Sequence, residues 1–253
     1  MPKTLINHQT TPQVKVFAGD PLLSISEMFT QTLQGEGFYI GTPATFLRVS
    51  GCHINCKFCD SALIWRKSHA FNLNEVLDIL ESSGTVERFR QGEHFIITGG
   101  APLLQEDEVL LLLQMFEKRF EFVPFIQVEN ECTIEPSKEL LEYVSCWNNS
   151  PKLKNSQVEQ FKRYKPRVIK KMSSLDNSWF KFVVGEKSDW EEIDLYYLQP
   201  KLIKREQIIL MPKGWGREEL EENRVMVAEL AMEKGVRFSD RLQITLYDMR
   251  VSV

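Results

Sequence analysis

The sequence has few cysteines, no long hydrophobic run and no strong excess of one charge. Its five cysteines, an odd number without paired spacing, indicate no disulfide framework and favour a reducing, cytoplasmic environment. Cys132 and Cys146 stand alone and are predicted to be buried structural thiols. The longest aliphatic run, Val109 to Leu113, is far shorter than the ~20 residues that cross a bilayer. The stretch from Met1 to Val16 lacks the apolar core of a signal peptide, and a net charge of −4 indicates no general affinity for nucleic acid or anionic membranes.

The rest of the composition is that of a globular protein, because 43% of the 253 residues are hydrophobic and 26% are charged. This length suits one large domain or a barrel-like α/β unit. No internal repeat, low-complexity tract or linker divides the chain, so a single domain over residues 1–253 is predicted. Two parts are expected to be irregular: a lead at 1–24 and a basic insertion at 153–178.

Strand and helix patterns alternate along the chain. Runs of β-branched and aromatic residues predict strands at 14–17, 45–49, 94–98, 123–129, 144–147, 179–184, 207–211 and 242–247. Apolar spacing predicts helices after the capping residue Asn72 and at 107–120, 137–144 and 218–234. This alternation predicts an α/β fold with a largely parallel sheet. In such folds ligands collect at the carboxyl ends of the strands, where the segments 52–61, 98–101, 129–130 and 150–152 are expected.

Three of the five cysteines lie in one loop. Cys52, Cys56 and Cys59 have the spacing Cys-x3-Cys-x2-Cys and follow the predicted strand at 45–49. Three thiolates this close suit an iron–sulfur cluster or zinc, and in a four-iron cluster they leave one iron open to a small-molecule ligand. Two further interpretations stay open at this point: a zinc site completed by His53 or a distant cysteine, and a chance group of core thiols.

The cysteine loop, with Phe58 directly before its last cysteine, resembles the radical S-adenosylmethionine (SAM) superfamily, in which the open iron binds SAM. Other motifs resemble one family within it, the 7-carboxy-7-deazaguanine synthases. Those motifs follow the family's order between residues 25 and 247 and are Gln34-Gly35-Glu36-Gly37, Arg48, Cys59-Asp60-Ser61, Thr98-Gly99-Gly100, Ser150-Pro151-Lys152 and Arg241-Leu242-Gln243-Ile244. The cysteine spacing indicates only the superfamily, whereas the Gln-Gly-Glu-Gly and Ser-Pro-Lys motifs indicate the family.

The resemblance implies a modified, partial (β/α) barrel with a 4Fe–4S cluster, SAM and Mg²⁺ as cofactors. The implied reaction converts 6-carboxy-5,6,7,8-tetrahydropterin to 7-carboxy-7-deazaguanine with loss of ammonia, in queuosine and 7-deazapurine biosynthesis. The implied partners are the pterin, a reducing protein such as a flavodoxin, and a second copy of the chain in a homodimer. One alternative is an activase of a glycyl-radical enzyme, which shares the cysteine spacing and acts on a protein, although the Gln-Gly-Glu-Gly motif argues against it. The other is a zinc-bound, non-enzymatic binding module, which would have little use for the glycine-rich strand ends.

Carried over residue by residue, the resemblance implies three sets of binding residues. The cluster ligands are Cys52, Cys56 and Cys59. The residues expected to contact SAM are Phe58, Cys59, Asp60, Gly100, Ser150, Pro151, Lys152, Met211, Pro212, Lys213 and Gly214. The residues expected to contact the substrate are Leu33, Gln34, Gly35, Glu36, Arg48 and Thr98. Arg48 offers a planar fork that suits a carboxylate, and Glu36 is an acceptor for the guanidine-like edge of a pterin.

The sequence departs from the family's pattern at two binding positions. Ser61 takes the place of a magnesium-ligating threonine and keeps the hydroxyl. Ala101 takes the place of an acidic residue that binds the amino group of SAM, so that contact is expected to come from elsewhere, with Glu129 as a candidate. The chain also ends without the proline expected near the substrate.

A block of basic residues lies within the insertion at 153–178. It comprises Lys162, Arg163, Lys165, Arg167, Lys170 and Lys171. A solvated surface is the simpler interpretation, and a docking site for an acidic partner is the alternative.

Overall fold

The computed structural model describes residues 2–13 and 19–250. Ten strands occur in these residues: β1 Lys3–Ile6, β2 Leu22–Leu33, β3 Pro43–Val49, β4 His69–Asn72, β5 His94–Gly99, β6 Ile126–Asn130, β7 Cys146–Asn149, β8 Ser178–Val184, β9 Ile208–Pro212 and β10 Arg237–Phe238. The α-helices are α1 Ala62–Trp65, α2 Leu73–Ser82, α3 Thr85–Arg90, α4 Glu106–Phe120, α5 Lys138–Tyr143, α6 Gln160–Arg163, α7 Pro166–Ser173, α8 Asp189–Ile193, α9 Arg217–Lys234 and α10 Leu242–Tyr247. Short segments of other helix types lie at Pro102–Gln105, Lys154–Ser156, Asp194–Leu198 and Arg205–Gln207.

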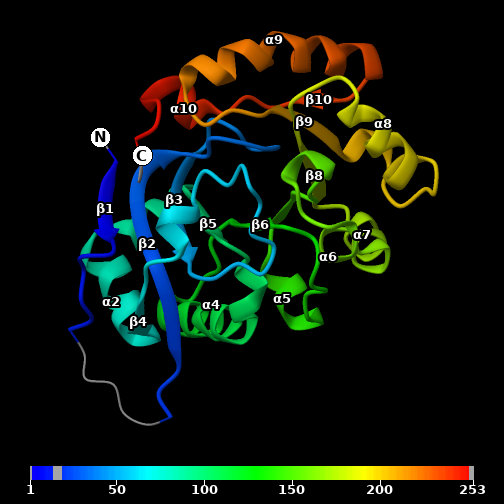
Figure 1. The fold of residues 1–253 in the computed structure, drawn as a ribbon. Coiled ribbons are helices and arrows are strands. Elements are labelled where there is room, and N and C mark those ends of the chain that lie inside the picture. The colour runs from blue at the N-terminus through cyan, green and yellow to red at the C-terminus, as the bar shows by residue number, and fades with distance from the viewer. Residues whose placement is uncertain (1, 14–18, 251–253) are drawn as a thin grey trace.

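The strands form one open, curved sheet in the order β1-β2-β3-β5-β6-β7-β8-β9-β10, with β4 paired to β2 (Figure 1). Every pair from β3 to β10 is parallel, whereas β1, β2, β3 and β4 pair antiparallel. Parallel neighbours need crossover connections, which the helices between successive strands supply. The prediction of an α/β fold with a largely parallel, partial (β/α) barrel is therefore confirmed.

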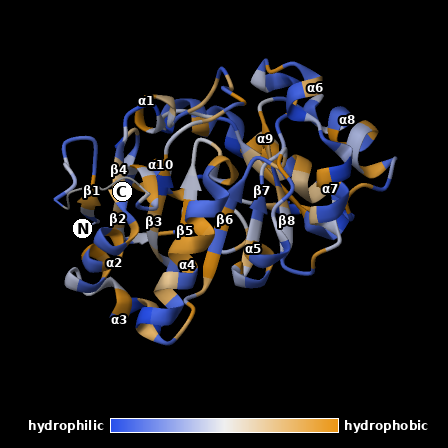
Figure 2. Ribbon diagram, turned by 90° about the horizontal axis from the view of Figure 1, so that it is seen from below, coloured by the Kyte–Doolittle hydropathy of each residue, from blue (hydrophilic) through white to orange (hydrophobic). Residues whose placement is uncertain are grey.

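The core lies between the sheet and the helices that cover its outer side. Figure 2 shows α2, α4 and α5 in front of the strands when the molecule is seen from below. Buried residues of α4, such as Val109, Leu112 and Phe116, recur at the spacing of one helix face and pack toward the sheet. Central strands are apolar on both faces, as in β5, where Phe95, Ile96 and Ile97 are fully buried.

Most predicted elements from 45 to 234 are found within two or three residues of the expected limits. The C-terminal strand is not: residues 242–247 form α10 instead. Apolar residues alternate from Leu242 to Tyr247, as they do in a strand with one buried face. In the structure Ile244 is buried but Leu246 is 47% exposed, so the alternating residues do not share one buried face. The edge beside β9 is taken by the two residues of β10.

Both parts that were expected to be irregular contain regular structure. In the lead, β1 pairs with β2, which starts at Leu22, and the strand predicted at 14–17 lies outside the described residues. In the insertion, Pro166 opens α7, whose Val168, Ile169 and Met172 are buried. The sequence contains this helical spacing, but the many basic residues obscured it.

The basic block is not uniformly solvated. Arg167 and Lys170 are exposed on α7, whereas Arg163 is buried and donates to Glu192 across 2.6 Å. Cys132 and Cys146 are both buried, as predicted. In the part of the chain that the structure describes, no helix combines the length and apolar character needed to cross a membrane.

Candidate functional site

The carboxyl ends of the parallel strands surround a cavity of about 540 Å³. Its wall includes the cysteine loop after β3 and the residues that follow β5, β6, β7 and β9. Of the residues predicted from the sequence to bind the cluster, SAM, substrate or magnesium, all line this cavity except Pro151 and Pro212. These two prolines are buried behind the wall. The fold therefore brings the predicted residues together, whereas it leaves the two prolines without direct access to a ligand.

The three cysteines of the loop are free thiols, partly buried, and all line the cavity. The Nε1 atom of Trp65 in α1 lies 3.4 Å from the Sγ atom of Cys59. Burial raises the pKa of the Cys56 thiol, and Lys152 opposes that shift. In residues 2–13 and 19–250, no three His, Cys, Asp or Glu side chains converge as ligands of a single ion. Three cysteine thiols on one wall can serve as ligands of an iron–sulfur cluster.

Beside the cysteines the wall offers both a cation and an unsatisfied carboxylate. Lys152 donates to the Ser150 hydroxyl across 2.9 Å. Glu131, after β6, has a side chain that is 4% exposed, and its Oε2 atom has no hydrogen-bond partner among the described residues. Its Oε1 atom accepts from Thr133 across 2.8 Å. The Oε1 atom also lies 3.8 Å from Nε2 of His53, and Glu131 lines the cavity together with Ser150 and Lys152.

Ala101 does not line the cavity. It is fully buried, and its amide donates to the Gly51 carbonyl across 2.8 Å, which fastens the end of β5 to the start of the cysteine loop. Glu129, the residue proposed from the sequence to supply the missing carboxylate, is already engaged elsewhere.

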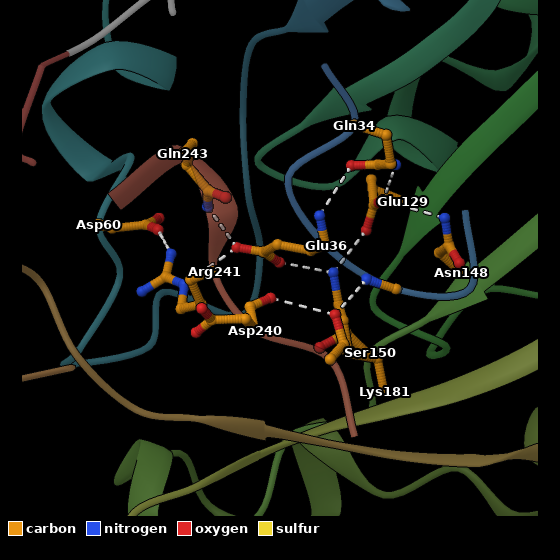
Figure 3. Close-up of polar contacts among 12 residues, drawn as sticks. Gln34, Glu36, Asp60, Glu129, Asn148, Ser150, Lys181, Asp240, Arg241 and Gln243 are labelled. Atoms are coloured by element: carbon orange, nitrogen blue, oxygen red, sulfur yellow. Dashed lines mark hydrogen bonds and ion pairs between the residues drawn. The ribbon is translucent and has the colours of Figure 1, made fainter. Parts of the chain in front are cut away.

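A row of alternating charges crosses the opposite part of the cavity (Figure 3). It runs from Asp60 in the cysteine loop through Arg241, Glu36 and Lys181 to Glu129 at the end of β6. The Nε atom of Arg241 lies 3.0 Å from Glu36, its Nη2 atom contacts Asp60, and its Nη1 atom donates to the Gly214 carbonyl. Lys181 Nζ lies 2.7 Å from Glu36 Oε2 and 2.9 Å from Glu129 Oε2. The row therefore joins five separate segments of the chain by ion pairs.

The charges of this row stabilise one another. Burial alone would raise the pKa of Glu36, but Lys181 and Arg241 outweigh burial and hold the pKa of Glu36 well below its usual range. Burial would lower the pKa of Lys181, but Glu129 and Glu36 outweigh burial and raise the Lys181 pKa. Both side chains are therefore ionised at neutral pH.

Polar amides fix the two carboxylates of the row. Gln243 in α10 donates to Glu36 Oε1 across 2.6 Å. Gln34 and Asn148 donate to Glu129 Oε1 across 3.0 and 3.1 Å. Each carboxylate is thus held by both an amide and an ammonium group, so its orientation toward the cavity is fixed before any ligand binds.

Arg48 on β3 and Glu27 on β2 form a further ion pair on the cavity wall, with Arg48 Nε 2.8 Å from Glu27 Oε1. The strand pairing places the two residues opposite one another. Thr98, at the end of β5, is the parallel-strand neighbour of Arg48. Ser61 directly precedes α1, and its Oγ atom lies 3.7 Å from the Sγ atom of Cys59.

Sequence reasoning missed Glu27, Lys181 and Gln243 as site residues, and it assigned no role to Arg241. The signal at Lys181 was a charged residue inside an otherwise apolar strand, which is rarely buried without partners. Arg241 and Gln243 belong to the C-terminal motif Arg241-Leu242-Gln243-Ile244. This segment was predicted to be a strand, and that prediction did not indicate that the two side chains reach Glu36.

Comparison with known proteins identifies the family. The model of the Radical SAM superfamily matches residues 47–224. The 7-carboxy-7-deazaguanine synthase of Halobacterium salinarum is 32% identical over 262 residues, which cover 95% of this chain and 96% of that protein. The synthase of Pyrobaculum aerophilum is 30% identical, over 88% of this chain and 94% of that protein. The crystal structure of QueE from Escherichia coli is similar with a TM-score of 0.64 and 25% identity, over 88% of this chain and 96% of that one. The chain therefore belongs to the radical SAM superfamily and, within it, to the 7-carboxy-7-deazaguanine synthase family.

Proposed function

We propose that this chain converts 6-carboxy-5,6,7,8-tetrahydropterin to 7-carboxy-7-deazaguanine with loss of ammonia, as a radical SAM lyase of queuosine and 7-deazapurine biosynthesis. The observation that carries the proposal is one cavity with three cysteine thiols on one part of its wall and Glu36, Arg48 and Thr98 on another. The first part suits the cofactors of the superfamily, and the second suits a ligand with both a carboxylate and N–H donors. The membership in the family supports the same reaction.

In this proposal Cys52, Cys56 and Cys59 hold the 4Fe–4S cluster. When bound, the cluster and SAM supply the one-electron chemistry that starts the rearrangement. Gly100, Ser150 and Lys152 line the SAM end of the cavity beside the cysteines. We assign to Glu131 the carboxylate contact that Ala101 does not supply, because Glu131 lines the cavity beside the cysteines.

The chain's own residues bind and orient the substrate. Arg48 takes the substrate carboxylate, since a guanidinium fork matches the two oxygens of that group. Glu36 accepts from the guanidine-like edge of the pterin, and Thr98 adds a hydroxyl between them on the end of β5. The side chains of Arg48 and Glu36 are each only 16% exposed, so charged contacts made there are less screened than at the surface.

The test is incubation of the anaerobically reconstituted, reduced protein with SAM and the carboxypterin, followed by mass spectrometry. Formation of 7-carboxy-7-deazaguanine together with ammonia supports the proposal. Cleavage of SAM without any pterin product would contradict it. In that case a glycyl-radical activase becomes the better interpretation, and the same preparation is then assayed on a protein substrate.

We expect Arg48→Lys to impair use of the carboxypterin more than cleavage of SAM. Lysine keeps the positive charge but loses the planar fork, so a charge-assisted contact worth about 1.5–3 kcal/mol is weakened. The expected result is a decrease in kcat/KM for the carboxypterin of roughly tenfold to a hundredfold. Steady-state kinetics with varied pterin, beside an assay of SAM cleavage, measures both effects. An unchanged kcat/KM would mean that Arg48 serves only its ion pair with Glu27.

We further propose that Ser61 contributes an oxygen ligand to Mg²⁺ beside the substrate carboxylate. Magnesium prefers oxygen ligands and keeps several waters, so a single hydroxyl on the cavity wall is a sufficient protein contribution. Ser61→Thr is expected to keep the stimulation of activity by magnesium, whereas Ser61→Ala is expected to lose most of it with unchanged iron content. Full stimulation of the alanine variant would assign the metal to another residue, such as Asp60.

The partners remain proposals. Lys57, Arg66 and Lys67 are exposed around the cysteine loop, which suits the approach of an acidic reducing protein such as a flavodoxin. Val225 and Met232 of α9 are 61% and 74% exposed and offer apolar surface for a homodimer. Light scattering tests the second proposal, and reduction of the cluster by a purified flavodoxin tests the first.

A further inference from the structure

Lys181 is a lysine whose ammonium group is enclosed between two carboxylates of the cavity wall. It projects from β8, and its side chain is only 4% exposed. The Nζ atom lies 2.7 Å from Glu36 Oε2 and 2.9 Å from Glu129 Oε2 (Figure 3). Burying an unpaired ammonium group costs much free energy. Lys181 can therefore be buried and charged here only because it pairs with these two carboxylates.

The two carboxylates are more open to the cavity than Lys181, which also lines it. Their side chains are 16% and 17% exposed, and both line the cavity. The Oε1 atom of Glu36 accepts from Arg241 and Gln243, and the Oε1 atom of Glu129 accepts from Gln34 and Asn148. Among the described residues, the Oε2 atom of each accepts from Lys181, which leaves it a further lone pair. Each carboxylate therefore retains an acceptor for a ligand N–H group.

The charge balance at this place depends on Lys181. Glu36 faces Lys181 from β8 and Arg241 and Gln243 from the C-terminal segment, with Glu129 beyond Lys181 and Asp60 beyond Arg241. Three carboxylates thus share two cations. Without Lys181, only Arg241 would remain among them, and burial would favour protonation of a carboxylate. A protonated carboxyl group loses part of its capacity to accept hydrogen bonds.

We propose that Lys181 is a positioning residue that keeps Glu36 and Glu129 ionised and oriented as paired acceptors for the N–H groups on the guanidine-like edge of the substrate. The inference rests on the proposed function, because it concerns the same ligand in the same cavity. It assigns Lys181 no bond to the reacting atoms. By keeping both carboxylates ionised, Lys181 selects ligands that present N–H donors to two anions.

The test compares Lys181→Met with the unaltered protein, because methionine has a similar length and no charge. We expect kcat/KM for the carboxypterin to decrease about tenfold or more at neutral pH, mainly through KM. We also expect a new pH dependence. Loss of Lys181 removes an effect that lowers the pKa of Glu36, so the pKa of Glu36 is expected to rise and kcat/KM to increase as the pH is raised through it. We expect no such increase from Glu36 in the unaltered protein, since its pKa is held well below the usual range.

Two controls separate this role from a structural one. Lys181→Arg keeps the charge and is expected to keep the flat pH profile. SAM binding and iron content are expected to be unchanged in both variants. If Lys181→Met does not fold, Lys181→Gln replaces it, because an amide still donates to a carboxylate but carries no charge.

The outcomes distinguish the two proposals. Absence of pterin turnover in the unaltered protein would count against the proposed function. Normal turnover in the unaltered protein, with a loss in the methionine variant that does not change with pH, would overturn the role of Lys181. Equal loss of SAM binding and pterin use would overturn it as well.

Discussion

Replacing Cys56 with alanine is expected to abolish iron binding, whereas replacing Cys146 with alanine is expected to leave it intact. Cys56 lines the same cavity as Cys52 and Cys59, so each of the three can hold one iron of a 4Fe–4S cluster. Removing one of three protein ligands leaves two irons without a protein ligand. Cys146 on β7 is buried, and burial together with Glu129 raises the pKa of its thiol to about 12. It is therefore a neutral thiol at pH 7, and it does not line the cavity that Cys52, Cys56 and Cys59 share.

The measurement is iron and sulfide content, with the visible absorption, after anaerobic reconstitution of both variants. We expect the colour and the iron of the Cys56→Ala protein to fall close to the level of untreated protein, and SAM cleavage to fall with them. The Cys146→Ala protein controls for the loss of any thiol and for handling. Comparable iron loss in both variants would show that the cluster is not held by the loop.

How far the sequence predicts this site depends on whether the information is local. The three cysteines, Glu36 and Arg48 are found from short motifs, because their spacing and neighbours are confined to a few residues. Lys181 has no such motif. Its function arises only when β8 lies beside β7 and β9 in the sheet and its side chain reaches Glu36, which precedes it by 145 residues. Contacts of this kind depend on strand order, and no single segment of the sequence determines strand order.

The C-terminal segment illustrates the same limit for the fold. Leu242 to Tyr247 alternates like a strand, and no local signal contradicts that prediction. The helix α10 is favoured by tertiary contacts: the Leu242 amide donates to the Gly35 carbonyl across 2.9 Å, and Gln243 reaches Glu36. The helix α4 was predicted well, because residues such as Val109, Leu112 and Phe116 recur at the spacing of one buried helix face. The end of α9 was predicted from Gly235, which is a local C-cap signal.

Gly100→Ala is expected to destabilise the protein strongly, and Gly185→Ala is expected to have little effect. Both glycines follow the last residue of a parallel strand, β5 and β8 respectively. A methyl group at Gly100 would overlap the Gly51 carbonyl oxygen and lie 2.6 Å from Cβ of Cys52. A methyl group at Gly185 would meet the flexible Lys213 side chain, with its Cδ atom at 3.3 Å. The two positions therefore differ in what the added carbon meets, backbone in one case and a movable side chain in the other.

For Gly100→Ala the clash cannot be relieved by a side-chain rotation, because backbone atoms of the cysteine loop must move. Overpacking of this kind costs about 3 kcal/mol, which for a chain of this size corresponds to a decrease in Tm on the order of 10 °C. Gly185→Ala is expected to change the free energy of unfolding by less than about 1 kcal/mol. Thermal unfolding of the iron-free proteins measures this effect without a contribution from the cluster. Because the loop that must move carries Cys52, the Gly100→Ala protein is also expected to take up less iron on reconstitution. If both variants unfold at the same temperature and bind the same amount of iron, the cysteine loop does not lie against the end of β5 in solution, and the cavity wall between Gly100 and Cys52 is arranged differently.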